Sequence, residues 1–266
     1  MRPVAIIQAR MGSTRFPGKV MKPILGRPML WHIVQRLRWT PSLADIVVAT
    51  SDQPGDEPIR CFCDEQHFRV FAGSEDDVLD RFYQAATRHP GDPYLRITAD
   101  CPFVDPEVVG RLIELYKTGR FDHVGVATGA GAVSLNRGRF PNGLDAECFS
   151  FAALERAWRE ATSPTDREHV TLYIWRQPDK FRHGMLMAEN DYPHLRWTVD
   201  YEIDYQLVCQ VYAALYREDK PFLMADILNY LASHPNLTRM NQEFIGKEGY
   251  QELWKAAGGP PCNERA

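Results

Sequence analysis

Short apolar runs rich in β-branched residues alternate with segments of helical periodicity through the first 120 residues of this chain. The runs predict strands at 4–8, 46–50, 69–72 and 94–98. Apolar residues spaced three and four apart predict helices at 28–38, 76–88 and 105–117. Strands that alternate with helices in this way build mostly parallel sheets with helices on both faces. The alternation therefore predicts an α/β fold with a mostly parallel central sheet.

The alternation loosens after about residue 120. A glycine-rich stretch, 125–143, predicts a long loop or a flap. Further helices are expected at 151–161, 166–176, 204–217 and 224–233, and a strand at 194–199 that ends in Asp200. Because no internal repeat or linker interrupts the chain, we expect one domain over 1–240. A C-terminal helix and a frayed tail are expected over 241–266.

The charge balance and the cysteine spacing exclude several classes of protein. The 31 lysines and arginines are outnumbered by 35 acidic residues, for a net charge of −4, which argues against a nucleic-acid partner. No apolar run approaches the roughly 20 residues that cross a bilayer, and the N-terminus does not resemble a secretory signal. The six cysteines and eight histidines form no paired spacing typical of a structural zinc site. We therefore expect a cytoplasmic protein with reduced thiols and no membrane partner.

A loop rich in glycine, hydroxyl and cationic residues follows the first predicted strand directly. Glycine-rich backbone binds anions through its N–H groups, and arginine and lysine neutralise phosphates. The spacing matches neither the P-loop nor the dinucleotide fingerprint, which disfavours both. The alternative is a surface turn with solvated charges. We interpret the loop as a polyphosphate site, whose candidate residues are Gln8, Ala9, Arg10, Gly12, Ser13, Thr14, Arg15 and Lys19.

Two aspartates stand in parallel contexts, each at the end of a short apolar run. Asp100 ends Leu95–Asp100 and Asp200 ends Leu195–Asp200. The carboxyl ends of parallel strands meet at one edge of a sheet, so the phosphate loop and Asp100 are expected to converge there. Two carboxylates beside phosphate groups suit Mg²⁺, which keeps water and substrate oxygens in its shell. For each aspartate alone, the alternative is a helix N-cap or a turn residue.

Three further segments carry weaker signals. The dipeptide Asn142-Gly143 predicts a turn, and the carboxylates that follow it are positioned to meet substrate hydroxyls or amines. A histidine near the start of a predicted helix is more often structural than catalytic. Ser74 either caps a helix or offers its groups to a nucleotide base. The candidate substrate-binding residues are Asn142, Asp145, Glu147, Glu168 and His169, and Ser74 joins the nucleotide-binding set.

The same segments resemble the cytidylyltransferases that activate sugar acids, and in particular their SpsF-type branch, which serves spore coat polysaccharide synthesis. The resemblance begins with the signature Ile6–Lys19 and continues in order over most of residues 4–240. Its further motifs are Ile46–Thr50, Gly73–Arg81, Arg96–Pro102, Asn142–Glu147, Arg167–Val170 and Arg196–Asp200.

The resemblance implies a three-layer α/β/α fold of the nucleotide-diphospho-sugar transferase (GT-A-like) type. It also implies that CTP triphosphate is held by Arg10, Ser13, Arg15 and Lys19, and Mg²⁺ by Asp100 and Asp200. Arg10, Lys19 and Asp100 are the implied catalytic residues. Where the sugar-acid enzymes carry Gly-Asp-Glu-Pro, this chain has Ala99-Asp-Cys-Pro102, so the acceptor need not be a sugar acid.

The implied reaction is transfer of CMP from CTP to a sugar, sugar acid or related small acceptor, with release of pyrophosphate. Residues 120–190 are expected to bind the acceptor and, between 149 and 175, to support a homodimer. One alternative is a GT-A-like glycosyltransferase, although Asp100 and Asp105 lack the usual Asp-x-Asp spacing. The other is a non-catalytic nucleotide-binding subunit.

Overall fold

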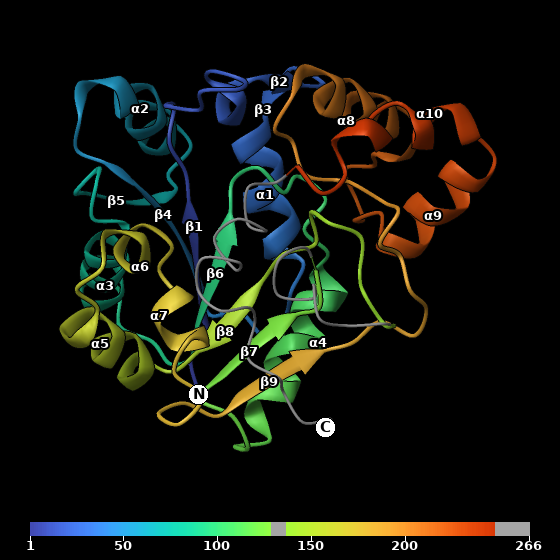
Figure 1. The fold of residues 1–266 in the computed structure, drawn as a ribbon. Coiled ribbons are helices and arrows are strands. Elements are labelled where there is room, and N and C mark those ends of the chain that lie inside the picture. The colour runs from blue at the N-terminus through green and yellow to red at the C-terminus, as the bar shows by residue number, and fades with distance from the viewer. Residues whose placement is uncertain (129–136, 248–266) are drawn as a thin grey trace.

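Seven strands form a central sheet in the computed structural model, which describes residues 1–128 and 137–247 (Figure 1). Across the sheet the order is β5-β4-β1-β6-β8-β7-β9. The strands are β1 (Val4–Gln8), β4 (Asp45–Ser51), β5 (Arg69–Gly73), β6 (Tyr94–Thr98), β7 (His123–Val126), β8 (Glu147–Phe149) and β9 (His183–Leu186). A separate hairpin pairs β2 (Pro23–Ile24) with β3 (Arg27–Pro28).

The pairing of the strands is mostly parallel, as predicted. Strands β5, β4, β1 and β6 run parallel to one another. Strand β8 is antiparallel to its neighbours β6 and β7, and β9 is again parallel to β7. Residues 4–7 of β1 are all buried, which is typical of a central strand covered on both faces.

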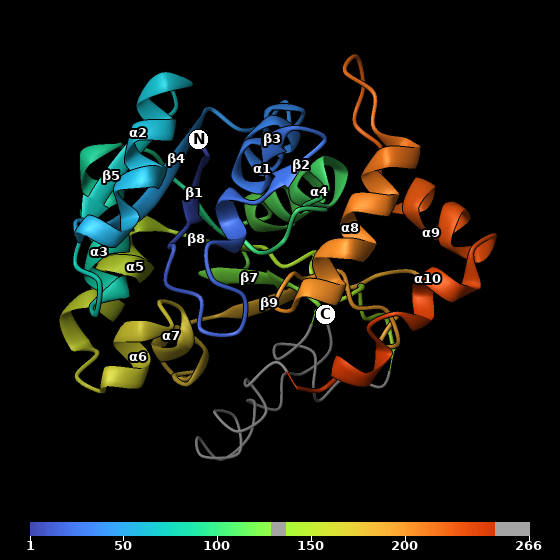
Figure 2. The ribbon, with the colours of Figure 1, turned by 90° about the horizontal axis from the view of Figure 1, so that it is seen from above.

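Helices cover both faces of the sheet, which gives the three-layer arrangement (Figure 2). One layer contains α1 (Met29–Arg38), α2 (Glu57–Glu65), α4 (Pro106–Lys117) and α8 (Glu202–Leu215). The other contains α3 (Val78–Arg88), α5 (Phe151–Glu160), α6 (Pro164–Glu168) and α7 (Leu172–Trp175). Beyond α8 lie α9 (Met224–Ala232) and α10 (Pro235–Arg239).

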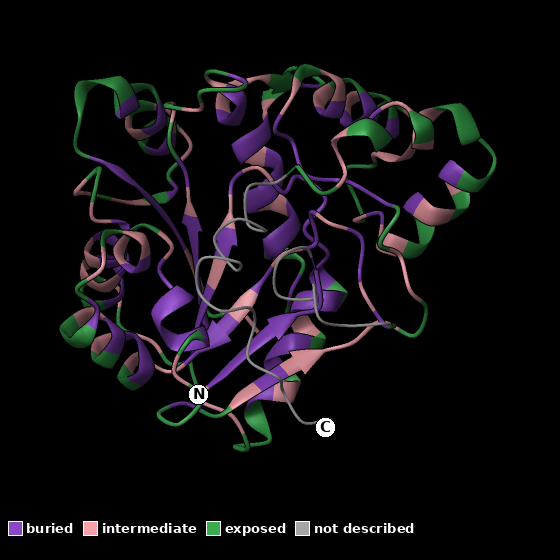
Figure 3. Cartoon of the chain, in the orientation of Figure 1, coloured by how far each residue is buried: buried purple, intermediate pink, exposed green. Residues whose placement is uncertain are grey.

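Each helix layer shares a separate apolar core with the sheet, because successive residues of a strand point to opposite faces. Ala5 and Ile7 belong to the core under α1 and α4. Val4 and Ile6 belong to the core under α3 and α5. Figure 3 shows the central strands buried and the outer helix surfaces exposed. This packing leaves the ends of the strands as the place where polar residues gather.

The helix-start signals are confirmed in one case and corrected in another. The Asp105 carboxylate accepts hydrogen bonds from the backbone N–H groups of Glu107 (2.8 Å) and Val108 (3.2 Å), so it caps α4 as its position indicates. Helix α3 begins later than expected, because Asp77 is its N-cap. The Ser74 hydroxyl accepts a hydrogen bond from the Asp77 backbone instead.

Several elements were not predicted or were predicted wrongly. Helix α2 and strands β7, β8 and β9 were missed. The three strands are only three or four residues long. Helix α2 does carry a helical pattern, since Ile59, Phe62 and Cys63 lie three and four residues apart, so it could have been predicted. The helix expected at 166–176 is two helices, α6 and α7, since Val170 adopts a φ of +50° between them. Strand β7 also takes the first residues of the stretch expected to be a loop, while 129–136 lie outside the described residues.

The strand expected at 194–199 is an extended segment with a single bridge. In this segment, the bridge pairs the backbone of Arg196 with that of Asn142. The partner segment cannot continue the ladder, because Pro141 has no N–H and Gly143 turns away with a φ of +108°. A side chain on Gly143 would lie 2.4 Å from the Thr198 nitrogen, so only glycine allows the two segments to approach.

The C-terminal part of the described chain ends in a short 3-10 helix, Gln242–Phe244. The helix and frayed tail expected at 241–266 fall mainly on 248–266, which lie outside the described residues. Within 1–128 and 137–247, the helices are all too short or too polar to cross a bilayer.

Candidate active site

The loop after β1 and the loop after β6 leave the sheet side by side at one edge. The backbone N–H of Ala9 donates to Ala49 O (3.0 Å) and that of Ala99 donates to Gln8 O (3.0 Å), so the strands stay paired to their last residues. The phosphate loop then runs to Gly18, whose φ of +68° lets the chain turn back toward the sheet. The turn brings Lys19 to the same edge as Asp100.

Lys19 joins the two aspartates that the sequence places 100 residues apart. Its Nζ lies 3.1 Å from Asp100 Oδ2 and 3.0 Å from Asp200 Oδ1. It also donates to the backbone oxygen of Val199 at 2.7 Å. The Lys19 side chain is only 10% exposed. Burial by itself would lower its pKa, but the two carboxylates raise it, so the ammonium stays charged at neutral pH.

The two carboxylates differ in exposure. The Asp100 side chain is 29% exposed and that of Asp200 is 9% exposed. Burial by itself would raise the pKa of Asp100, but the nearby Lys19 ammonium and a hydrogen bond from Thr98 lower it. Both carboxylates reach the same nitrogen, so they lie at one edge and face one another as the sequence predicts.

Asp200 is held by three cations. Besides Lys19, its Oδ1 accepts from Arg15 at 2.9 Å, and its Oδ2 accepts from Arg196 at 3.0 Å. Arg196 has a fully buried side chain and also pairs with Asp204 at 3.0 Å. Asp204 in turn accepts hydrogen bonds from the backbone of Asp200 (2.9 Å) and so fixes the start of α8.

The donor set at this edge fits a divalent ion that shares its shell with a substrate. The described residues contain no group of three or more histidine, cysteine or acidic side chains able to hold a metal alone. Asp100 and Asp200 both contact Lys19 Nζ, so their carboxylates lie close together. Two such carboxylates suit Mg²⁺ when phosphate and water oxygens complete its shell. Asp100 is the more accessible of the two carboxylates, while Asp200 Oδ1 is bonded to Arg15 and Lys19.

The remaining residues of the phosphate loop lie near the surface. Arg10, Gly12 and Thr14 are exposed. Ser13 is half-buried and its hydroxyl accepts a hydrogen bond from Phe16 N at 3.4 Å, which stabilises the loop. Arg15 is 37% exposed on its side chain, so it reaches from solvent to Asp200. The loop thus presents exposed cations and backbone N–H groups above the buried Lys19.

Comparison with known proteins identifies the family. The sequence model of the family described as cytidylyltransferase matches residues 4–230, which is most of the chain. The chain belongs to the cytidylyltransferase family. It is 36% identical over 214 residues to the spore coat polysaccharide biosynthesis protein SpsF of Bacillus subtilis. The match covers 78% of this chain and 85% of that protein. The SpsF resemblance drawn from the motifs is therefore confirmed.

Solved structures agree with the fold. A cytidylyltransferase from Leptospira borgpetersenii superposes with a TM-score of 0.81 at 27% identity, over 90% of this chain and 97% of that one. A CMP:2-keto-3-deoxy-manno-octonic acid synthetase, solved in complex with CTP, superposes with a TM-score of 0.59 at 17% identity, over 80% and 99%. At that identity the second match shows the fold alone. This cytidylyltransferase is a CTP-dependent nucleotidyltransferase of the predicted α/β class.

Asp56 is a residue of this cytidylyltransferase that the sequence analysis missed. It is buried, with 5% exposure, beside the end of β4. Its Oδ1 accepts from the backbone N–H of Met11 at 2.6 Å, and its Oδ2 accepts from the Ser51 hydroxyl at 2.6 Å. Burial by itself would raise the pKa of Asp56, but these hydrogen bonds lower it, so the group is a carboxylate. Asp56 therefore fixes the phosphate loop against β4.

We expect Asp56→Asn to weaken CTP binding about tenfold, because the amide can direct an N–H group at a backbone or hydroxyl donor that needs an acceptor. Asp52→Asn is the matched control, since Asp52 is exposed and bonds to the neighbouring Gln53 side chain. Titration calorimetry with CTP measures the affinity, and hydrogen exchange at the Met11 amide reports the loop. Unchanged affinity together with unchanged exchange at Met11 would show that Asp56 does not position the loop.

Glu147 lies inside a cluster of donors beside β6. Its carboxylate accepts from Arg96 (2.8 Å), Thr171 (2.9 Å), Trp175 Nε1 (2.8 Å) and His123 (3.2 Å). Burial by itself would raise its pKa, but the hydrogen bond from His123 and the Arg96 charge lower it. The four donors occupy both oxygens of the carboxylate, which faces protein rather than a substrate.

The Arg96 guanidinium connects this cluster to the phosphate loop. Its Nε and one terminal nitrogen each lie 3.3 Å from Gln8 Oε1. Burial, together with the positive charges of Arg96 and Arg10, lowers the pKa of His169, although Glu168 opposes this shift. Gln8 and Arg96 therefore lie side by side at the start of the phosphate loop, while His169 is half-buried and Glu168 is exposed.

Asp145 lies on the Asp100 side of the site. Its Oδ2 accepts from the backbone of Gly143 at 2.8 Å and lies 3.9 Å from the Cys101 thiol, and its Oδ1 accepts from the Thr128 hydroxyl. Burial raises the pKa of Asp145, partly offset by these hydrogen bonds. Ser74 lies away from this group, at the end of β5, where its backbone oxygen accepts from the buried Arg81.

Proposed function

We propose that this cytidylyltransferase transfers CMP from CTP to a sugar, sugar acid or related small acceptor and releases pyrophosphate. The observation that carries the proposal is the contact of Lys19 with both Asp100 and Asp200 at the edge where the phosphate loop ends. Support for a sugar-related acceptor comes from the similarity to SpsF, a spore coat polysaccharide biosynthesis protein.

In the proposed reaction, an acceptor oxygen attacks the α-phosphorus of CTP in line. The new bond joins that oxygen to the α-phosphorus, and the bond to the bridging oxygen breaks, so both electrons leave with pyrophosphate. The acceptor proton passes to solvent or to a nearby carboxylate. Such a reaction needs positioned reactants and neutralised charge rather than a protein nucleophile.

The chain's own residues supply the positive charge. Arg10 is exposed, and Arg15 is exposed while paired with Asp200, so both are placed to turn toward the phosphates. Lys19 would exchange its two carboxylates for the β- and γ-phosphate oxygens. Mg²⁺ held by Asp100 and Asp200 would supply further charge neutralisation at the phosphate oxygens. Because Asp200 keeps its bond to Arg196, the carboxylate stays oriented while Lys19 moves.

We propose that the acceptor binds on the β8 side, within residues 120–190. Asn142, Asp145, Glu168 and His169 are the candidate contacts. Glu147 acts differently from the initial expectation: since its oxygens are occupied by protein donors, it orients Arg96 toward the site. Homodimer formation through 149–175 stays a prediction, as does a location in the cytoplasm.

A pyrophosphate-release assay with CTP, Mg²⁺ and a panel of acceptors tests the proposal. The panel contains sugar acids, sugar phosphates and free sugars, with ATP, GTP and UTP as alternative nucleotides. We expect release with CTP and one acceptor class. CTP binding in calorimetry without release on any acceptor would instead support a non-catalytic nucleotide-binding subunit, and hydrolysis or transfer from a nucleotide-sugar would support a glycosyltransferase.

A further inference from the structure

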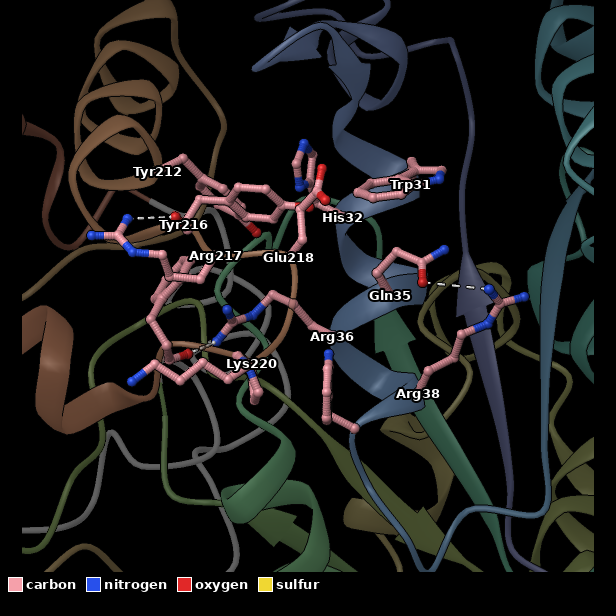
Figure 4. Close-up of a pocket in the computed structure, with 13 residues that line it drawn as sticks. Trp31, His32, Gln35, Arg36, Arg38, Tyr212, Tyr216, Arg217, Glu218 and Lys220 are labelled. Atoms are coloured by element: carbon pink, nitrogen blue, oxygen red, sulfur yellow. Dashed lines mark hydrogen bonds between the residues drawn. The ribbon is translucent and has the colours of Figure 1, made fainter.

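A cavity lies apart from the active site, between helix α1 and the segment that follows α8 (Figure 4). Its volume is about 310 Å³, within the range of small-ligand sites. Its lining comes from 31–39 and 212–222, and includes none of Lys19, Asp100 or Asp200. A molecule in this cavity would therefore be distinct from the nucleotide and acceptor of the proposed reaction.

A buried cation, Arg36, forms part of the cavity wall. Arg36 is 5% exposed, and its Nε and one terminal nitrogen donate to the backbone oxygens of Val104 and Phe222, both at 2.8 Å. The guanidinium also lies 4.2 Å from the centre of the Phe222 ring. Within the described residues, Arg36 forms no ion pair with a carboxylate. Buried charges are usually paired, so this wall favours an anion.

Further cations surround the opening. Arg38, Arg217 and Lys220 line the cavity and are exposed, whereas Glu218 is the one acidic residue in its lining. Within the part of the chain that the structure describes, Glu218 forms no ion pair with any of these cations. The cavity therefore carries an excess of positive charge, although the protein as a whole is acidic with a net charge of −4.

Aromatic rings form the other part of the wall. Trp39, directly after α1, is 46% exposed, which is unusual for so large an apolar side chain, and Trp31, near the start of α1, is half-buried. Tyr216 lies across from Trp31, on the segment after α8 (Figure 4). Exposed aromatic faces beside a cavity are suited to stacking against a planar ring.

His32, between these walls, does not add to the charge. Its Nε2 is bonded to the backbone oxygen of Ile24 at 2.7 Å. Burial lowers the pKa of His32 to about 4, and the charges of Arg36 and Arg27 contribute to the shift. The ring is therefore neutral at physiological pH, and the positive charge of the cavity comes from its arginines and its lysine.

We propose that this cavity binds a small organic phosphate that carries a planar ring. The phosphate would contact Arg36 and the cations at the opening, since guanidinium groups bind phosphate oxygens in pairs. The ring would lie between Trp31 and Tyr216. This site is independent of the proposed cytidylyl transfer, and neither proposal requires the other.

Titration of the whole protein with phenyl phosphate tests the site. Calorimetry and the fluorescence of the tryptophans measure the binding. We expect saturable binding below about 10 mM. Inorganic phosphate and phenol, which each carry half of the proposed recognition features, are expected to bind at least about tenfold more weakly. Equal binding of inorganic phosphate and phenyl phosphate would contradict the proposed ring contact, and absence of binding would overturn the site.

Substitutions test whether phenyl phosphate binds in this cavity. The double variant Arg217→Gln/Lys220→Gln should weaken phenyl phosphate about tenfold, because it removes two charges at the opening without touching buried contacts. Trp31→Leu should weaken phenyl phosphate binding but leave the binding of inorganic phosphate unchanged. Arg88→Gln/Lys117→Gln, exposed residues that do not line the cavity, is the matched control and should change nothing. Binding lost in Lys19→Ala and retained in the cavity variants would place phenyl phosphate at the active site and refute the proposal.

Discussion

Replacing Lys19 by alanine is expected to lower the rate of pyrophosphate release from CTP by roughly two to three orders of magnitude. The side chain is the single cation that contacts both Asp100 and Asp200 within the described chain, and it is buried where solvent cannot replace it. Without it, two carboxylates would face one another with less positive charge between them, and the departing pyrophosphate would lose a neutralising group.

The measurement is pyrophosphate release at saturating CTP, with CTP affinity from calorimetry and folding from circular dichroism. Lys22→Ala is the matched control, because Lys22 lies one turn further on and packs against the ring of Phe16 rather than against a carboxylate. We expect the control to retain nearly full turnover. A Lys19→Ala protein that folds and turns over within a few-fold of the parent would remove the basis of the proposed function.

Replacing Arg196 by leucine is expected to reduce the free energy of unfolding by about 3–5 kcal/mol. Its guanidinium is fully buried between Asp200 and Asp204, at 3.0 Å from each. Burial by itself would lower the pKa of Arg196, but the carboxylates, Asp204 foremost, raise it. Leucine would leave two carboxylates in the interior without this partner, and would release the start of α8 and the orientation of Asp200.

Urea denaturation followed by circular dichroism measures the loss. Arg182→Met is the comparison, because Arg182 also pairs with an aspartate, Asp122, but at the surface where water screens the charges. We expect only a small change there. If both variants lost the same stability, the buried triad would contribute no more than a surface pair, and the explanation of how Asp200 is oriented would be wrong.

The layered fold could be predicted from sequence because it depends on local patterns. Apolar runs at β1, β4 and β6 and the helical periodicity of α1, α3 and α4 are visible within ten or so residues. Elements without a strong pattern were missed. Strand β9 is half-polar, and the segment 194–199 has a strand-like composition but pairs at one residue only, since Pro141 and Gly143 end its partner.

The site was predicted in part for the same reason. The phosphate loop and Asp100 follow strands directly, so the carboxyl ends of a parallel sheet bring them together. Asp56 was missed because nothing in its neighbourhood shows that it accepts the Met11 amide 45 residues away. Glu147 was wrongly assigned to the substrate because its protein partners cannot be recognised in the sequence. Its four donors come from three separate parts of the chain.

By itself, the sequence determined the α/β class, the edge of the sheet where polar groups collect, and the resemblance to cytidylyltransferases. These follow from residue periodicity and from motifs, which are read along the chain. Only the tertiary structure decided that Lys19 contacts Asp200, that Arg196 is buried between two carboxylates, and that Arg36 donates to backbone oxygens and to no acidic side chain of the described residues. The contacts of Lys19 with Asp200 and of Arg36 with Phe222 join segments more than a hundred residues apart. The partners of Arg196 are close in sequence, but its burial also depends on packing, which is a property of the whole folded chain.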